Sequence, residues 1–131
     1  MAYWIFVIND TDEVFAERMK ERTWPIFVYT QNRRHLNVGD HVIFYKAGAK
    51  GQKFLGSARV SSPVEKKKID YSMGLGDIAI WKEGVSVVPL LEKLEFVRNM
   101  ASWGVYFQGG VKSISEDDYT TIVNSANKKN V

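Results

Sequence analysis

Two strand-like segments joined by a glycine-rich turn place the firmest limit on the fold of this chain. Residues 41–46 (HVIFYK) are mostly apolar, and residues 53–62 (KFLGSARVSS) alternate between the two faces of a strand. The turn between them, AGAKGQ, contains two glycines, so the segments are predicted to pair as an antiparallel hairpin. Gly56 lies within the second segment and contributes no side-chain packing, which indicates a bulge or a close approach of another backbone.

The N-terminal part of the chain predicts a buried strand followed by a short helix. Residues 3–9 (YWIFVIN) form an apolar run, typical of a strand that is covered on both faces. Asp10 and Glu13 have the spacing of a capping box, which predicts a helix over residues 12–21. Pro25 disfavours the helical conformation at Trp24, so the helix is expected to end before this pair.

The rest of the chain predicts further short elements and no internal repeat. Residues 63–76 contain proline, a lysine run and two glycines, and we expect a long loop there. The other expected elements are a loop over 30–37, one or two strands within 77–90, a helical turn opening at Pro89, an irregular aromatic stretch over 99–110, a strand over 111–114, a helix begun by Ser115 and a frayed tail over 127–131.

These elements together predict a single α+β domain over residues 1–131. About five to six strands with hairpin turns imply mostly antiparallel pairing in a small curved β-barrel, flanked by two or three short helices.

The composition argues against catalysis, cofactors and metals. Cysteine is absent, which excludes disulfides and thiolate chemistry. His35 and His41 have no third ligand in a metal-binding spacing, and no nucleophile motif or phosphate-binding glycine loop is present. We therefore expect no catalytic residue, no cofactor and no metal. The first apolar run is too short to span a bilayer, so we expect a cytoplasmic protein without a membrane partner.

Positive charge is concentrated in the middle of the chain. The formal net charge is +3, but residues 41–70 alone carry seven Lys and Arg against two Asp and Glu. Such a block is typical of a basic patch that binds phosphates, although a solvated face without a partner remains an open alternative. The residues predicted to contact phosphates are Arg33, Arg34, Lys46, Lys50 and Lys53, with the run at 66–68 as a further candidate.

Two of the four tryptophans, Trp24 and Trp103, lie in segments that look irregular. Aromatic rings of this kind can stack a planar base, a contact that contributes about 1–3 kcal/mol per base in nucleic-acid sites. A role in the core is an equally open interpretation for both rings.

Several segments resemble the EVE domain, a small domain of the PUA-like superfamily related to the YTH RNA readers. The similarity extends from Tyr3 to about Ile122 and rests on the segments YWIFVIN, VGDHVIFYKAG, KFLGSARV and LLEKLEFVRNMASWGVYFQGGVKSISEDDYTTI. The resemblance implies a curved β-barrel and a non-enzymatic module that holds a modified DNA or RNA base in an aromatic pocket, as YTH readers hold a methylated adenine.

The same resemblance implies which residues form the pocket. Trp24 matches a tryptophan that forms a pocket wall in YTH readers, and Asn9 matches a polar residue near the pocket floor. Trp103 matches the tryptophan of the C-terminal WG motif, and Phe107 and Gln108 are candidates by proximity. An effector enzyme, if one is used, is expected on another chain.

The chain departs from the family pattern near this pocket. Residues 10–15 lack the Glu-Asn-Trp that many EVE domains have, and Pro25 removes a backbone donor beside Trp24. The identity of the base, and the choice between DNA and RNA, therefore stay open. The alternatives are a small-molecule or peptide-binding module that uses the same pocket, and an enzyme that acts on a bound base.

Overall fold

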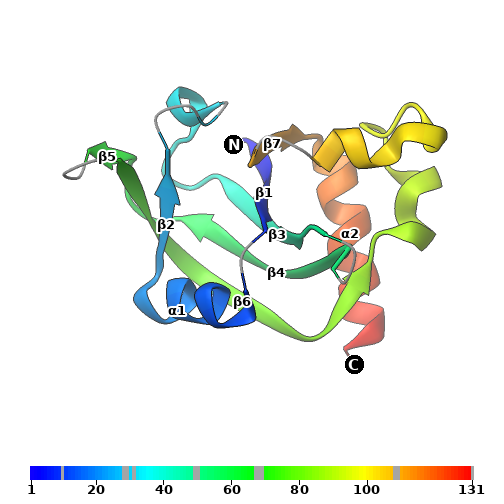
Figure 1. The fold of residues 1–131 in the computed structure, drawn as a ribbon, viewed down its shortest axis with the longest axis horizontal. Helices are drawn as coiled ribbons and strands as arrows, with labels where there is room; N and C mark the ends of the chain where they lie inside the picture. Colours follow the sequence, from blue (N-terminus) through cyan, green and yellow to red (C-terminus); the bar gives the residue numbers. More distant parts are fainter. Residues whose placement is uncertain are drawn as a thin grey trace.

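The computed structural model describes residues 1–9, 11–27, 30, 32–48, 51–66, 70–107 and 110–130. Within these residues seven strands form one curled sheet, with helices at its two sides (Figure 1). The strands are β1 (Tyr3–Ile8), β2 (Thr23–Ile26), β3 (His41–Lys46), β4 (Lys53–Val60), β5 (Glu65–Lys66), β6 (Tyr71–Ser86) and β7 (Val111–Ile114). The helices are α1 (Asp12–Glu21) and α2 (Glu116–Lys129), with the 3-10 helices η1 (Arg33–His35), η2 (Val88–Lys93) and η3 (Met100–Phe107).

The sheet has the order β2-β6-β4-β3-β1-β7, with β5 paired to β6 beside this path. All described pairs are antiparallel except β1 with β3, which run parallel. The predicted α+β class and curved, mostly antiparallel sheet are confirmed. The strand number exceeds the prediction because β2 and β5 come from segments expected to be irregular.

Strand β1 is covered on both faces, as its apolar run predicts. Trp4, Phe6 and Ile8 belong to a first core inside the curl, and α1 closes this core with Phe15. Ile5 belongs to a second core on the other face of the sheet, under η2, η3 and α2. The sheet therefore separates two apolar layers, and successive residues of a strand enter different ones.

The predicted hairpin is present as β3 and β4, with a register shift between Phe44 and Tyr45. Gly56 lies in β4, where a Cβ atom would overlap the carbonyl oxygen of Ala79 in β6. The close backbone approach expected at this glycine is confirmed.

Helix α1 has the predicted bounds but a different cap. The Oγ1 of Thr11 accepts a hydrogen bond from the backbone N–H of Val14 at 3.3 Å, so Thr11 is the N-cap. Asp10, the predicted cap, lies outside the described residues. The helix ends at Glu21 and is capped by Arg22, which adopts a left-handed conformation with φ of 58°, so its end precedes Trp24 and Pro25. These two residues lie in β2, which pairs only with β6 among the described strands, and an edge strand tolerates the missing N–H of proline.

The long loop predicted over residues 63–76 is wrong. Strand β5 lies within it, and β6 begins at Tyr71 and continues unbroken to Ser86. Gly74 is a strand residue against which the side chains of Ser61 and Ser62 press, and its N–H donates to the Oγ of Ser62 at 2.8 Å. The glycines read as turn formers thus permit a close side-chain approach.

The C-terminal part is more ordered than the sequence predicts. Most of the stretch expected to be irregular forms η3, which is kinked at Ser102. Helix α2 has Ser115 as its N-cap, whose Oγ accepts from the N–H of Asp118 at 3.1 Å. The sequence predicts a frayed tail from residue 127, and this prediction is wrong for residues 127–130. Helix α2 reaches Lys129, and the Asn130 amide exchanges two hydrogen bonds with the backbone of Glu83, at 2.7 and 3.1 Å.

Candidate functional site

Trp24 lies in the first core and is only 4% exposed. Its ring centroid is 5.1 Å from that of Phe44 and 5.5 Å from that of Phe6, and Phe15 meets it edge-on at 6.4 Å. The Arg18 guanidinium, from α1, lies over the indole at 4.8 Å. The expectation that Trp24 occupies an irregular segment is wrong, because β2 turns alternate residues into the core.

Trp103 and Phe107 belong to the second core and are therefore separated from Trp24 by the sheet. Phe107 is buried and stacks on Tyr45 at 4.3 Å, while half-buried Trp103 meets Phe107 edge-on at 6.0 Å. Neighbouring residues Phe44 and Tyr45 thus contact different candidate rings on opposite faces of β3. The structure does not combine these candidates into a single aromatic pocket. Gln108, the last candidate of this group, lies outside the described residues.

Asn9 is exposed and directly follows β1. The carbonyl oxygen of Ile8 accepts a hydrogen bond from the N–H of Ala47 at 3.0 Å, so this end of β1 is tied to the end of β3. Asn9 therefore lies exposed at the carboxyl ends of the two parallel strands β1 and β3.

The predicted phosphate contacts fall into two separate groups. Lys46 and Lys53 face each other across the β3–β4 hairpin, and Lys53 is also in register with Ser86 at the end of β6. The Arg33 guanidinium lies 4.8 Å from the ring centroid of Tyr71, at the beginning of β6, and exposed Arg34 follows it. The length of β6 keeps the groups apart. Lys50 lies outside the described residues, as do the last two lysines of the run at 66–68.

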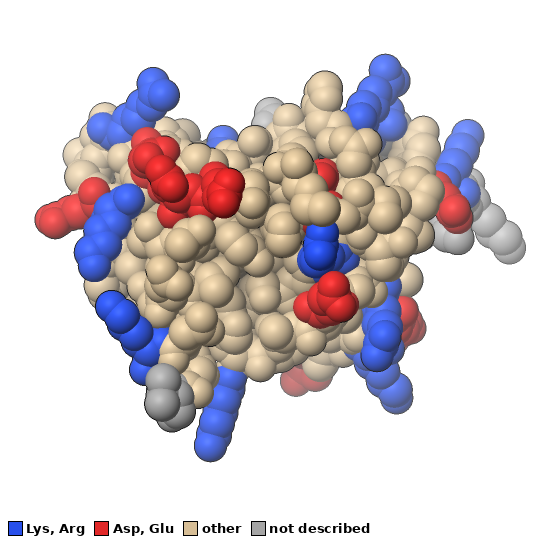
Figure 2. Space-filling model, turned by 180° about the vertical axis from the view of Figure 1, so that it is seen from behind, with Lys and Arg blue, Asp and Glu red and all other residues tan. Residues whose placement is uncertain are grey.

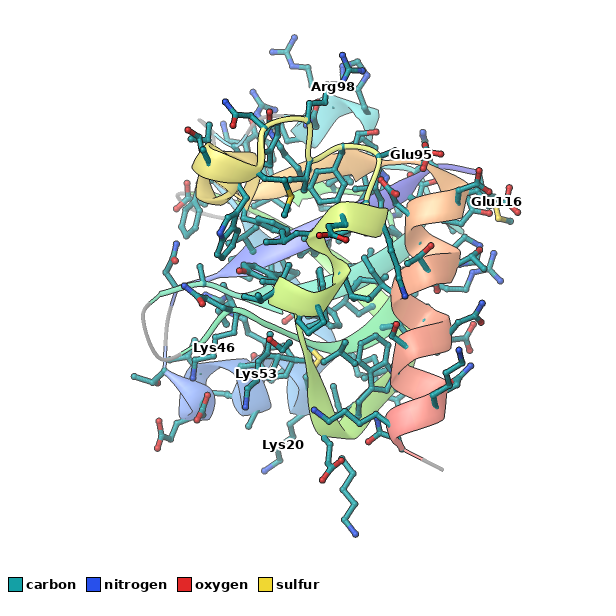
Figure 3. All side chains as sticks on the ribbon, turned by 90° about the vertical axis from the view of Figure 1, so that its right-hand side faces the viewer. Lys20, Lys46, Lys53, Glu95, Arg98 and Glu116 are labelled. Atoms are coloured by element: carbon teal, nitrogen blue, oxygen red, sulfur yellow. The ribbon has the colours of Figure 1, made fainter. Side chains whose placement is uncertain are left out.

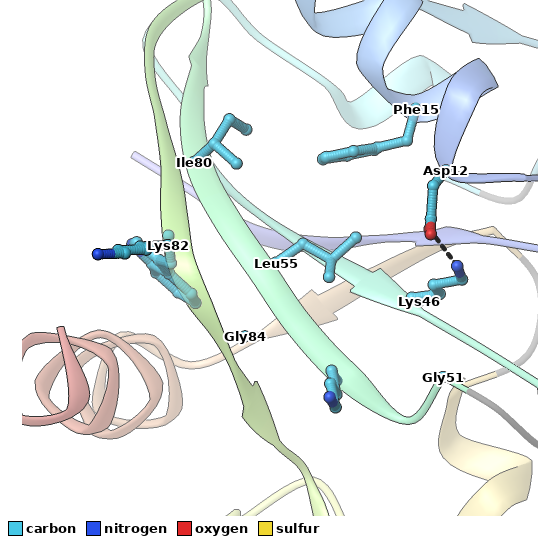
Figure 4. A pocket seen from close by; sticks show the side chains of 10 residues that line it. Asp12, Phe15, Lys46, Gly51, Leu55, Ile80, Lys82 and Gly84 are labelled. Carbon is cyan, nitrogen blue, oxygen red and sulfur yellow. Dashed lines mark hydrogen bonds and ion pairs between the residues drawn. The ribbon is translucent and has the colours of Figure 1, made fainter.

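A hollow of about 370 Å³ opens between α1 and the sheet (Figure 4). We call it the α1 cleft. Its lining residues are Asp12, Phe15, Lys46, Gly51, Lys53, Leu55, Ile80, Trp81, Lys82 and Gly84. The cleft brings Lys46 and Lys53 together with apolar side chains, and the Lys46 ammonium forms an ion pair with Asp12.

Sequence reasoning missed the other cleft residues. The signal was the alternation itself, because Lys53 with Leu55 and Ile80 with Lys82 occupy every second position of their strands. The sequence predicts one or two strands within residues 77–90 without fixing their bounds, so it does not assign Ile80 to a face.

The EVE domain model matches residues 2–125, which is nearly the whole chain. The chain belongs to the EVE domain family. No curated protein sequence matches this EVE domain.

Solved structures similar to this EVE domain share its fold at low sequence identity. A hypothetical protein from Leishmania major has a TM-score of 0.75 and 17% identity, over 98% of this chain and 96% of its own. Human THYN1, in complex with DNA containing 5-methylcytosine, has a TM-score of 0.68 and 9% identity, over 96% and 98%. The Mmi1 YTH domain has a TM-score of 0.63 and 12% identity, over 98% and 76%. These likenesses show that this EVE domain shares its fold with THYN1 and with the Mmi1 YTH domain, as expected from the sequence.

Burial shifts the pKa of several groups in this EVE domain. Burial raises the pKa of Tyr45 to about 12, so its hydroxyl stays protonated under Phe107. Burial also raises the pKa of Asp118, against the opposing effect of hydrogen bonds from the N–H groups of Glu95 (2.8 Å) and Phe96 (3.2 Å). Asp118 thereby ties the start of α2 to the segment after η2.

His41 lies in a second aromatic group, on the face of β3 turned toward α2. Its imidazole stacks on Tyr3 at 4.8 Å with 7° between the ring planes, and Tyr119 of α2 leans against both. Burial lowers the pKa of His41, and the charge of Arg59 acts in the same direction. The neutral imidazole is therefore the form that this packing favours.

The described residues contain no group of three or more His, Cys, Asp or Glu arranged to hold a metal ion. Among the same residues, no helix is long and apolar enough to cross a membrane.

Proposed function

We propose that this EVE domain is a non-enzymatic module that binds nucleic acid and accepts one modified or flipped base. The observation that carries the proposal is the match along nearly the whole chain to human THYN1, whose structure contains DNA with 5-methylcytosine. Membership of the EVE family and the similarity to a YTH domain support the same class of ligand.

The contacts around Asn9 and Trp24 fit such a role. The Asn9 amide has both donors and an acceptor for the edge of a base, and it is exposed at the end of β1. Trp24 offers an indole whose neighbour Arg18 comes from the surface helix α1. A base that displaces Arg18, or stacks on its guanidinium plane, would add one ring to the aromatic cluster of Phe6, Trp24 and Phe44.

An unpaired target suits this architecture better than an intact duplex. Extracting a base from a duplex costs a few kcal/mol, and this cost is absent when the base is already unpaired. We therefore expect single-stranded or distorted nucleic acid to bind more tightly than a matched duplex of the same sequence.

Asn9→Ala tests the proposal without disturbing the core. Removing a desolvated hydrogen-bonding group costs about 1–3 kcal/mol, so affinity for the preferred modified oligonucleotide should fall about 5- to 150-fold. Fluorescence anisotropy would measure this with short single strands that carry 5-methylcytosine, a methylated adenine or no modification. The matched control is Asn124→Ala, on the exposed face of α2, which should leave the affinity unchanged.

The same titrations decide between this function and a small-molecule or peptide-binding module. Phosphate binding releases counterions, so affinity for single strands must fall steeply between about 50 and 200 mM salt. No binding at low salt, or an affinity independent of salt, would contradict the nucleic-acid proposal. Nucleosides recovered chemically changed after incubation would contradict its non-enzymatic part.

A further inference from the structure

The α1 cleft combines an apolar floor with lysines at its rim. Phe15, Leu55 and Ile80 supply the floor, and Ile80 is 50% exposed although it is a large apolar side chain. Lys53 and Lys82 are exposed and form no hydrogen bond or ion pair with any residue that the structure describes. A hollow of about 370 Å³ also lies within the usual range of ligand sites, about 300–1,000 Å³.

We propose that the α1 cleft binds a nucleotide flanking the recognised base, with its phosphate on Lys53 and Lys46 and its sugar and base on the apolar floor. The inference rests on the proposed function and assigns a path to the strand. Apolar contact with a base face is tolerant of sequence, as a flanking position requires. Lys53 reaches the cleft from β4, and Lys46 from the neighbouring strand β3 (Figures 3 and 4).

The charge balance of the cleft favours an anionic occupant. Three lysines line it against the single carboxylate of Asp12, which pairs with Lys46. The Asp12 side chain is 81% exposed, whereas that of Lys46 is 25% exposed. Exposed ion pairs of this kind contribute little to stability, so a phosphate can take the place of Asp12 on a lysine that is already positioned.

The face seen from behind and the Arg33–Arg34 pair offer less for a backbone to follow. On the side seen from behind, Lys and Arg stand mainly around the rim, while the middle of the face is mostly uncharged (Figure 2). Arg33 and Arg34 lie near the beginning of β6, away from the cleft.

Two substitutions with opposite expected effects test the inference. Lys53→Gln removes a phosphate contact, so affinity for a labelled oligothymidylate of about nine nucleotides should fall about three- to tenfold, and the salt slope should shrink by about 0.7. Asp12→Asn removes the competing carboxylate and releases Lys46, so affinity should rise about two- to threefold. The control Arg98→Gln removes one exposed charge at the opposite end of the molecule (Figure 3) and should change neither quantity.

The outcomes separate this inference from the proposed function. If Lys53→Gln and Asp12→Asn bind oligothymidylate as Arg98→Gln does, the α1 cleft is not on the path of the strand, even where modified bases are still preferred. If Asp12→Asn binds more weakly than the parent protein, the exchange of a phosphate for Asp12 is wrong. If the two substitutions change affinity as expected but the parent protein does not prefer any modified base over the unmodified one, the proposed base recognition is wrong and the inference about the cleft stands. A thermal melting curve of each variant verifies that it is folded at the temperature of the binding measurements.

Discussion

At the scale of single residues, Arg18 and the surrounding aromatic side chains leave Trp24 only 4% exposed. The guanidinium covers part of the indole, and Phe6, Phe15 and Phe44 surround the remainder. If a base binds here as proposed, it must displace Arg18 to contact Trp24, or stack on the guanidinium and leave the indole covered. The Trp24 ring is also part of the core, so a substitution of Trp24 lowers the stability of the fold and does not test binding alone.

Trp24→Ala should destabilise the fold severely. Truncating a buried Trp costs about 3–5 kcal/mol, a large share of the roughly 5–15 kcal/mol that keeps an ordinary domain folded. Urea denaturation would measure the loss. Trp103→Ala is the comparison, because its ring is half-buried and should cost clearly less. Equal losses for the two variants would show that the burial of Trp24 does not govern its contribution.

His41 should make stability depend on pH near neutrality. Its pKa is lowered in the folded state, so the unfolded chain binds the proton more readily and the free energy of unfolding falls as the pH drops through about 6.5. The groups that act on it are Arg59 and the N-terminal amine, which oppose protonation, and Asp40 and Glu116, which favour it.

His41→Phe keeps a ring against Tyr3 and removes the titration. The variant should lose less stability than the parent between about pH 7.5 and 5.5, a window that contains the ordinary histidine pKa of about 6.5. Chemical denaturation at several pH values measures this. Parallel curves for the two proteins would rule out His41 as the source.

At the scale of elements, the backbone approach between β4 and β6 depends on a missing side chain. Gly56→Ala forces a Cβ atom against the carbonyl oxygen of Ala79, and the sheet must shift locally. We expect a loss of about 1–3 kcal/mol in denaturation experiments, as in overpacked cores.

Gly104→Ala is the matched control for this substitution. Apart from its chain neighbours and the backbone of its own helix, no heavy atom of the described residues lies within 4 Å of the position that its Cβ would take, and its φ is not positive. Stability should stay level or increase by a few tenths of a kcal/mol. A loss equal to that of Gly56→Ala would show that the contact with β6 is not the cause.

The sequence predicts an element well where its hydrophobic pattern and the turn or cap residues at its end indicate the same structure. Strands β3 and β4 have alternation and a glycine-rich turn, and α2 has Ser115 at its cap. The start of strand β6 is not predicted, because a glycine such as Gly74 usually indicates a turn. In the structure this glycine is needed inside a strand, where a larger side chain would clash with Ser61 and Ser62. The residues around a glycine in the sequence do not show which distant side chain or backbone will pack against it.

The candidate site was predictable only as a set of residue types. The basic block and the unusual tryptophans are visible in the sequence, and the lysines of the hairpin do meet in a cleft. The sequence does not reveal that the sheet separates Trp24 from Trp103, because that depends on the face to which each segment contributes. Nor does it place Phe15 and Ile80 beside the lysines, since both arrive from other elements.

At the scale of the whole molecule, the order of the strands in space differs from their order along the chain. Strand β1 is made first but pairs with β3 on one side and with β7 on the other, so its two partners come from distant parts of the sequence. The curl is complete only when both neighbours are in place.

This placement of β1 has a kinetic consequence. During synthesis on the ribosome, the most apolar strand leaves the exit tunnel long before β7 exists, and chains grow at about 5–20 residues per second. One edge of β1 must therefore wait for seconds with its backbone groups unpaired. Folds dominated by such distant pairings also close slowly, in milliseconds to seconds. The nascent chain is accordingly most exposed to aggregation, and most in need of chaperones, until its last strand emerges.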